Sequence, residues 1–218
     1  MIHVVPFTSP AQQAAVVDRV AAHLRAGGLI ACPTETVYGF GCALQADALD
    51  RLAMLKRRTA GKPFLILVRE ARDVHGIEWS NEALALAAAF WPGPLTLAVR
   101  VKPDTFPGRV VSEDGTVAIR ATSHHGLRRV LEALNGPITS TSANAPGGRP
   151  ARSVREVRAV LDEVDAPGLL VLDGGTLPVS RPSTIVDATV RPPRVLRAGA
   201  IDPADLAEIV HGIGTSEV

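Results

Sequence analysis

The sequence predicts a single α/β domain built on a mixed β-sheet. Strand-like and helix-like segments alternate along most of the 218 residues, which is typical of α/β proteins. Some strands follow one another with no helix between them, so antiparallel pairs are expected beside parallel ones. The chain shows no internal repeat, low-complexity segment or linker, and one domain is therefore the simplest organisation.

The first elements are a strand and a capped helix. Residues 3–6 form a short apolar strand. Ser9 and Pro10 then supply a cap residue and a proline suited to the first helical turn, and Gly27 ends the helix. The residues expected on its inner face are Val17, Val20, Ala21 and Leu24.

The next elements surround a polar loop. Residues 29–32 form a second strand, which opens into that loop. Asp47 is expected to cap a helix with its inner face at Leu49, Leu52, Ala53 and Leu55. Residues 64–68 form a buried type of strand, and Ser80 caps an alanine-rich helix that runs to about residue 91.

The second half contains two strands in succession, at residues 95–101 and 117–120. A helix is expected from Ser123 to Leu134, with His124 and His125 facing solvent. The later strands are at 138–141, 169–173, 183–187 and 194–197, and the later helices run from 153 to about 163 and from Pro203 onward. A loose tail is expected after Gly212.

Composition excludes several classes of protein. The net charge is +1, so the whole chain is not a general nucleic-acid binder, and any basic site must be local. No apolar run approaches the roughly 20 residues of a membrane span, and the N-terminus lacks the pattern of a secretory signal. We therefore expect a cytoplasmic protein that does not bind membranes, with Cys32 and Cys42 buried as small apolar residues.

The loop at residues 33–39 has the sequence PTETVYG, more polar than a simple connection requires. In open α/β sheets, ligands bind beyond the strand ends. Hydroxyls and free backbone amides would suit a small polar ligand there. The alternative is a turn in which the threonine side chains satisfy the backbone.

Residues 56–62 carry four cations in seven positions. Lys56 and Lys62 are two of only three lysines in a chain with twenty arginines. This density suggests a polyanion such as phosphate. The alternative is a solvated helix end, where cations favour the helix dipole. A Walker A loop is excluded, because Pro63 follows Gly61–Lys62.

Two further segments follow predicted strands. Residues 140–148 combine hydroxyls, an amide and glycines, which could hold phosphate or ribose or could form a capped turn. Residues 183–187 and Arg197 form the other. The sequence has no GxSxG, HExxH, CxxC or Rossmann glycine pattern and no obvious cage of carboxylates for a metal.

Together these segments resemble the YrdC family of L-threonylcarbamoyladenylate synthases. The matching motifs, between residues 29 and 201, are PTETVYGFG, Lys56-x-Arg58 with KPF, WPGPLTL, VAIR, TSAN, STIVD and RVLRAGAI. The resemblance implies a twisted mixed sheet flanked by helices, with a basic concave cavity. It places one YrdC-like domain at residues 1–212 and a tail at 213–218, with no additional C-terminal domain expected.

The resemblance also implies a reaction. Family members join ATP, L-threonine and bicarbonate into threonylcarbamoyl-AMP, pyrophosphate and water. A separate tRNA threonylcarbamoyl-transferase complex then modifies the adenosine next to the anticodon. Mg²⁺ is expected to arrive with ATP, without a ligand from the protein.

Site residues are implied by the matched motifs. Those matching the ATP contacts are Lys56, Arg58, Lys62, Thr116, Ser142, Asn144, Arg149 and Arg197. Those matching the L-threonine contacts are Thr36, Arg120, Ser140 and Ser183, with Thr34 nearby. No side chain is expected to act as a nucleophile. Lys56 and Arg58 are expected to stabilise charge on the phosphates.

Two positions depart from the family pattern. Thr59 stands where proline is common, and Leu67 stands where many members have a histidine that contacts threonine. An RNA-binding paralogue without synthase activity therefore stays open, as does weak RNA binding by a synthase, although the aromatic content of 4% offers little for base stacking. A third possibility is a carbamoyltransferase-like domain of hydrogenase maturation.

Overall fold

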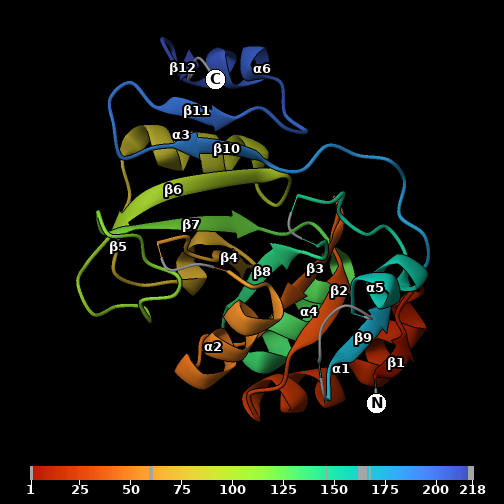
Figure 1. Cartoon of the computed structure of the whole chain (residues 1–218). Helices are drawn as coiled ribbons and strands as arrows, with labels where there is room; N and C mark the ends of the chain where they lie inside the picture. Colours follow the sequence, from red (N-terminus) through yellow and green to blue (C-terminus); the bar gives the residue numbers. More distant parts are fainter. Residues whose placement is uncertain (1, 59–60, 146, 162–165, 167, 216–218) are drawn as a thin grey trace.

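A computed structural model describes residues 2–58, 61–145, 147–161, 166 and 168–215. Eleven strands form one continuous mixed sheet in the order β1-β9-β2-β3-β8-β4-β7-β6-β10-β11-β12, and β5 pairs with β6 outside this path (Figure 1). β1 and β12 lie at opposite ends of the sheet. The predicted α/β fold with a mixed sheet is confirmed.

The strands are β1 (His3–Pro6), β2 (Ile30–Pro33), β3 (Tyr38–Gly41), β4 (Leu65–Val68), β5 (Ile77–Glu78), β6 (Leu95–Val101), β7 (Thr116–Ala121), β8 (Ile138–Ser142), β9 (Leu170–Asp173), β10 (Thr184–Asp187), β11 (Arg194–Arg197) and β12 (Gly214–Thr215). The helices are α1 (Pro10–Arg25), α2 (Ala46–Leu55), α3 (Asn81–Phe90), α4 (His125–Leu134), α5 (Val154–Leu161) and α6 (Pro203–Ile209), with a 3₁₀ turn η1 (Ala71–Asp73).

The main difference from the expected elements lies after β2. The segment Tyr38–Gly41, predicted as loop, is strand β3, which pairs antiparallel with β2 on one side and β8 on the other. Gly39 and Gly41 make this segment look like a loop in the sequence. Glycine is needed at these positions because the backbone of β8 lies close to them. A Cβ at Gly41 would lie 2.3 Å from the Thr139 carbonyl oxygen. The polar loop is thereby reduced to the hairpin turn 34–37.

Two helix starts also differ. Gln45, and not Asp47, is the N-cap of α2, and it makes no side-chain capping bond. His124 caps α4 in place of Ser123, since its Nδ1 accepts from the Leu127 amide at 3.2 Å. The His124 ring also stacks on Phe7 at 5.8 Å, and burial lowers its pKa. His124 is therefore partly buried, contrary to the prediction that it faces solvent. His125 is exposed, as predicted.

Residues 214–215, expected in a loose tail, form strand β12, which pairs in parallel with β11, and residues 216–218 of that tail lie outside the described residues. The end of the helix expected at 153–163 and the departure at Thr59 lie outside the described residues. Cys32 and Cys42 are buried and free, as predicted, and burial raises the pKa of their thiols to about 12 and about 11.

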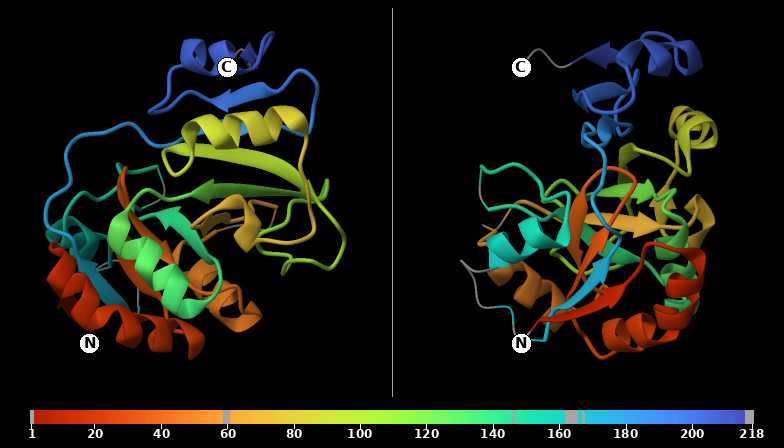
Figure 2. Two further views of the ribbon diagram at one scale, coloured as in Figure 1. Left: turned by 180° about the vertical axis from the view of Figure 1, so that it is seen from behind. Right: turned by 90° about the vertical axis from the view of Figure 1, so that its right-hand side faces the viewer.

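Two clusters of apolar residues form the core. One lies under α1 and α4, which pack side by side, and contains Val20, Leu67 and Leu131 (Figure 2). The other contains residues of α2, α3, α5 and α6. Among the described helices, none has both the length and the apolar character required to cross a membrane.

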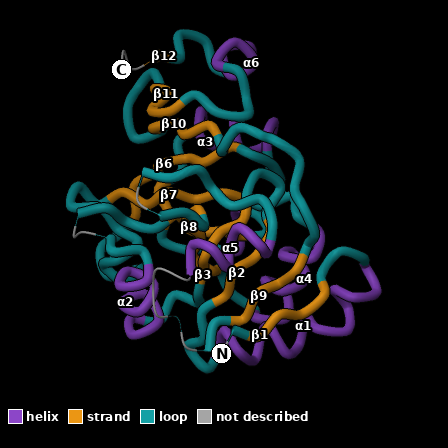
Figure 3. Tube along the Cα trace, turned by 45° about the vertical axis from the view of Figure 1, so that its right-hand side comes forward, coloured by secondary structure: helices purple, strands orange, loops and turns teal. Residues whose placement is uncertain are grey.

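The connection 174–183 between β9 and β10 runs as a long strap along one side of the molecule (Figure 3). The buried hydroxyl of Tyr38 fastens its start: it accepts from the Gly174 amide and donates to the Gly175 carbonyl, both at 2.9 Å. Arg152 holds the Leu177 carbonyl, and Ser180 donates to the Thr36 carbonyl at 2.5 Å. The strap is thus joined to the hairpin turn.

The close approach of β3 and β8 can be tested with Gly41→Ala. The added methyl would overlap the Thr139 carbonyl, and we expect a loss of about 1–3 kcal/mol in the free energy of unfolding. Gly136→Ala is the matched control, since its Cβ would have no neighbour within 4 Å. Equal denaturant midpoints for the two variants would contradict the observed spacing.

Candidate functional site

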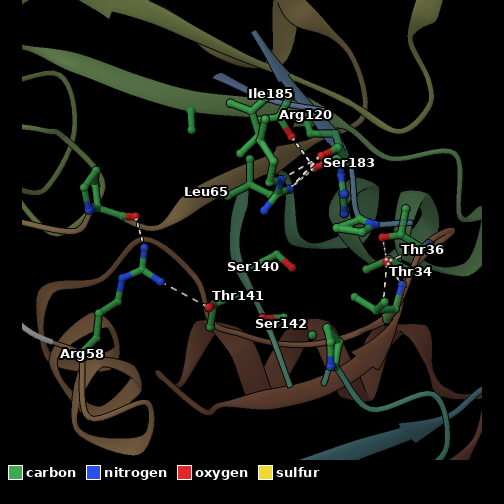
Figure 4. A pocket seen from close by; sticks show the side chains of 18 residues that line it. Thr34, Thr36, Arg58, Leu65, Arg120, Ser140, Thr141, Ser142, Ser183 and Ile185 are labelled. Carbon is green, nitrogen blue, oxygen red and sulfur yellow. Dashed lines mark hydrogen bonds between the residues drawn. The ribbon is translucent and has the colours of Figure 1, made fainter. Parts of the chain in front are cut away.

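A cavity of about 330 Å³ opens where the hairpin turn, the strap and several strand ends meet (Figure 4). It is lined by Thr34, Thr36, Val37, Gly39, Arg58, Pro63, Leu65, Thr96, Ala118, Arg120, Ser140, Thr141, Ser142, Pro150, Pro182, Ser183, Ile185 and Arg197. Three arginines and seven hydroxyl groups are in this lining, while carboxylates are absent from it within the described ranges. The site therefore suits an anionic, hydrogen-bonding ligand.

The hairpin turn gives its two threonines different roles. The Thr34 hydroxyl accepts from the Thr36 and Val37 amides, both at 3.1 Å, and donates to the Val37 carbonyl at 2.7 Å. Its single hydrogen is therefore used within the turn. Thr36 lies 3.0 Å from Thr34, hydroxyl to hydroxyl, and retains capacity to bind a ligand. Thr34 thus holds the turn and Thr36 faces the cavity.

Between these threonines, Glu35 lies behind the cavity wall. Its Oε2 accepts from the Thr122 hydroxyl at 2.6 Å, and its Oε1 lies 3.3 Å from Arg120 Nε. Neither Oε1 nor Nε has a hydrogen bond within the described part of the chain, so their contact is an electrostatic attraction without a hydrogen bond. The Arg120 side chain is 5% exposed and that of Glu35 is 13% exposed. The carboxylate therefore balances the charge of a buried arginine.

Arg197 and Thr96 converge on Ser183. Arg197 donates through Nε and Nη2 to the Ser183 carbonyl, at 3.3 and 2.7 Å, and Nη2 lies 3.2 Å from the Ser183 hydroxyl. Thr96 donates to the same hydroxyl at 2.9 Å. Burial, and then repulsion from Arg120, lower the pKa of Arg197. Two guanidiniums therefore lie within electrostatic reach of one another at this end of the cavity.

Ser140 faces the cavity from β8, with no hydrogen bond found for its hydroxyl among the described residues. A Cβ at neighbouring Gly39 would lie 2.8 Å from that hydroxyl. Glycine at position 39 therefore keeps Ser140 accessible to a ligand.

Lys56 is bound to the end of β8 and to the loop that follows it. Its ammonium group donates to the carbonyls of Ser142 and Asn144, at 2.7 and 2.6 Å, and lies 3.1 Å from Asn144 Oδ1. These contacts engage all three of its hydrogens. Burial, and then repulsion from Arg58, lower the pKa of Lys56 to about 8. Lys56 does not line the cavity in this conformation, and a contact with phosphate would replace one of these bonds.

Arg58 lines the cavity and is held by its neighbours. Its Nε and Nη2 donate to the carbonyls of Lys62 and Pro63, both at 2.6 Å, and its guanidinium carbon lies 4.7 Å from the Phe64 ring centre. These contacts fix the guanidinium at the cavity edge. Nη1 lies 3.4 Å from the Thr141 hydroxyl.

The structure thus brings most of the sequence-predicted residues together. The cavity lining includes Thr34, Thr36, Arg58, Arg120, Ser140, Ser142, Ser183 and Arg197. Outside the lining are Lys56, Lys62, Thr116, Asn144 and Arg149. Lys62 is exposed and borders a neighbouring cavity of about 270 Å³. Thr116 hydrogen-bonds Ser112 and Asp114, and Arg149 is exposed.

Leu67 pairs with Arg120 across β4 and β7 but is fully buried in the core under α1 and α4. The apolar core therefore extends to this position.

Sequence reasoning missed Glu35 and Thr96, although Glu35 lies in the motif PTETVYG and Thr96 lies in WPGPLTL. The hydroxyl that each contacts is 87 residues away, Thr122 for Glu35 and Ser183 for Thr96, so nothing local indicated these roles.

Comparison with known proteins gives consistent matches. The family profile for Sua5, YciO and YrdC, described as "Telomere recombination", matches residues 22–199. The threonylcarbamoyl-AMP synthase of Pyrococcus abyssi is 35% identical over 199 residues, covering 89% of this chain and 57% of that protein. The threonylcarbamoyl-AMP synthase of Coxiella burnetii, strain RSA 493, is 36% identical over 169 residues, covering 76% of this chain and 88% of that protein.

Solved structures agree with these matches. P. abyssi Sua5 complexed with L-threonine superimposes with a TM-score of 0.86 and 29% identity, over 99% of this chain and 62% of that one. E. coli YciO superimposes with a TM-score of 0.78 and 26% identity, over 93% of this chain and 97% of that one. This chain therefore spans somewhat over half of the Pyrococcus proteins and nearly the full length of YciO.

The Glu35–Arg120 pair leads to a prediction about stability. Glu35→Ala would leave a buried guanidinium without its counter-charge, which typically costs about 3–5 kcal/mol in the free energy of unfolding. Asp50→Ala is the control, because Asp50 pairs with Arg109 at 2.8 Å with both side chains roughly half exposed. Removing that surface pair should cost at most about 1 kcal/mol. Similar losses in urea unfolding would contradict the role of Glu35.

Proposed function

The chain belongs to the Sua5/YciO/YrdC family, and we propose that it is an L-threonylcarbamoyladenylate synthase. It would convert ATP, L-threonine and bicarbonate into threonylcarbamoyl-AMP, pyrophosphate and water. The observation that carries this proposal is one cavity that combines Arg58, Arg120 and Arg197 with buried hydroxyls. The synthases of P. abyssi and C. burnetii support it by their identity to this chain.

L-Threonine would bind at the inner end of the cavity. Arg120 is the candidate for its carboxylate, because the guanidinium is buried, lines the cavity and has no hydrogen bond among the described residues. Thr36, Ser140 and Ser183 line the same cavity and would offer hydroxyls to the remaining polar atoms. The L-threonine complex of P. abyssi Sua5 supports an amino-acid site in this fold.

ATP would bind beside L-threonine in the same cavity, with Arg58 and Arg197 on its phosphates. Ser142, Asn144 and Lys56 form one connected group beside it, and Lys56 would turn from this loop to a phosphate. Thr116, Lys62 and Arg149 would make peripheral nucleotide contacts. The described lining lacks a carboxylate, which fits Mg²⁺ carried by ATP phosphates and water, where it would neutralise phosphate charge.

Catalysis would then depend on positioning and charge stabilisation. The threonine amine and bicarbonate give N-carboxy-threonine, whose carboxylate attacks the α-phosphorus as pyrophosphate leaves. Arg58 and Lys56 would stabilise the charge that develops on the phosphates. This route requires no nucleophilic side chain, and the site is rich in arginine and hydroxyl groups.

The product would pass to a tRNA threonylcarbamoyl-transferase complex, and we place this reaction in the cytoplasm.

The second candidate function is that of a paralogue that binds RNA without synthase activity. Leu67 favours it, because an apolar side chain replaces the histidine of many family members. Weak RNA binding would be compatible with either function.

The proposed reaction predicts that pyrophosphate release depends on all three substrates. The measurement is release from the purified chain with ATP and Mg²⁺, omitting threonine or bicarbonate in turn. We expect release only in the complete mixture, because neither substrate alone forms the attacking carboxylate. Equal release without threonine would overturn the synthase assignment. Salt-sensitive RNA binding with no release would support the paralogue.

The polar pocket also predicts substrate selectivity. Serine lacks one methyl group of threonine, which is worth about 10–200-fold in kcat/KM. Valine keeps the shape but leaves pocket hydroxyls without a partner, so it should be rejected more strongly. The expected order of kcat/KM, with ATP and bicarbonate saturating, is threonine, serine, valine. Faster turnover of valine than of serine would mean that the pocket selects by shape alone.

A further inference from the structure

Thr96 is a buried hydroxyl residue that the proposed reaction does not use directly. It lies on β6, is 2% exposed and lines the cavity next to Ser183, which is 4% exposed. Thr96 Oγ1 donates a hydrogen bond to Ser183 Oγ at 2.9 Å. Its effect on a ligand would therefore pass through Ser183.

The hydrogen bonds of Ser183 leave one group unused. A serine hydroxyl has two acceptor positions and one hydrogen. Thr96 occupies one acceptor position, and Arg197 Nη2, at 3.2 Å, occupies the other. No acceptor for the Ser183 hydrogen is found among the described residues. Since Ser183 lines the cavity, this hydrogen is available to a ligand atom there.

We propose that Thr96 is a positioning residue for the amino-acid pocket, which makes Ser183 a hydrogen-bond donor toward the carboxylate of the substrate. This inference rests on the proposed function and deepens it. If the Thr96–Ser183 bond ran in the opposite direction, Ser183 would present a lone pair to the carboxylate and repel it. Donation by Thr96 also polarises the Ser183 hydroxyl and makes it a better donor.

Arg120 supports a carboxylate as the acceptor. Arg120 lines the same cavity as Ser183, and both are labelled among the lining residues in Figure 4. An oxyanion that meets Arg120 can therefore accept from the serine hydroxyl as well. A guanidinium attracts an anion in any orientation because it is positively charged. The Ser183 hydroxyl attracts the anion only when its hydrogen points toward it. Thr96 ensures that orientation.

The test is isothermal titration of the purified full chain with L-threonine, in wild type, Thr96→Val, Thr96→Ser, Ser183→Ala and the double variant Thr96→Val/Ser183→Ala. Thr96→Val keeps the shape of the side chain and removes the hydroxyl. We expect it to weaken threonine binding about three- to tenfold, in line with one hydrogen bond, while Thr96→Ser retains binding. Titration with ATP should give wild-type affinity in both Thr96 variants.

The double variant separates positioning from general damage. If Thr96 acts through Ser183, Thr96→Val adds no further loss when Ser183 is already alanine. Thr139→Val is the matched control, since Thr139 is a buried strand threonine bonded to Cys42 outside the cavity. It should lower thermal stability without changing threonine affinity. If Thr96→Val fails to fold, Thr96→Ala takes its place in the same comparisons.

Two results would overturn the inference while the proposed function stands: wild-type threonine affinity in Thr96→Val, or losses that add fully in the double variant. A wild-type chain that binds ATP but shows no binding of threonine would instead overturn the proposed function, and the role of Thr96 with it. A parallel measurement of KM should show the Thr96→Val change in KM for threonine, with kcat nearly unchanged.

Discussion

Polar groups buried in a protein must find hydrogen-bond partners, and this requirement organises the whole site. Thr34 satisfies the backbone of its own turn, Tyr38 fastens the strap, and Glu35 balances Arg120. A ligand meets the polar groups that these internal bonds leave free. They are the hydroxyls of Thr36 and Ser140, the hydrogen of Ser183 and the outer faces of the arginines. The internal bonds thus determine which groups are free to bind.

The same requirement explains where the charges lie. The chain is nearly neutral, yet three arginines line its cavity, and among the described residues only Arg120 has a carboxylate partner. Glu35, behind the wall, balances the charge of Arg120, and Arg197 contacts carbonyl and hydroxyl oxygens. A site with this excess of positive charge is prepared for an anion, because the ligand supplies the charge that the protein omits.

Local patterns predicted much of the fold. The bounds of β1, β6 and β11 and the caps Ser9 and Ser80 are as expected, because alternation and capping act over a few residues. β3 was missed because its glycines serve a close approach to β8 that no local pattern reveals. Eight of the residues implied by the family resemblance line one cavity. The hydrogen bonds of Lys56 to Ser142 and Asn144, 86 and 88 residues away, could not be predicted.

Tyr38 is the single tyrosine of the chain, so tyrosine absorbance reports on the start of the strap, where Tyr38 is bonded. Burial is the main reason that its pKa rises from 10.0 to about 12. A phenolate cannot donate to the Gly175 carbonyl, so the strap loses that bond when the tyrosine ionises. The ultraviolet absorbance of phenolate therefore comes from one side chain at one fastening point. An alkaline titration therefore reports the loss of one bond, from Tyr38 to the Gly175 carbonyl at the start of the strap.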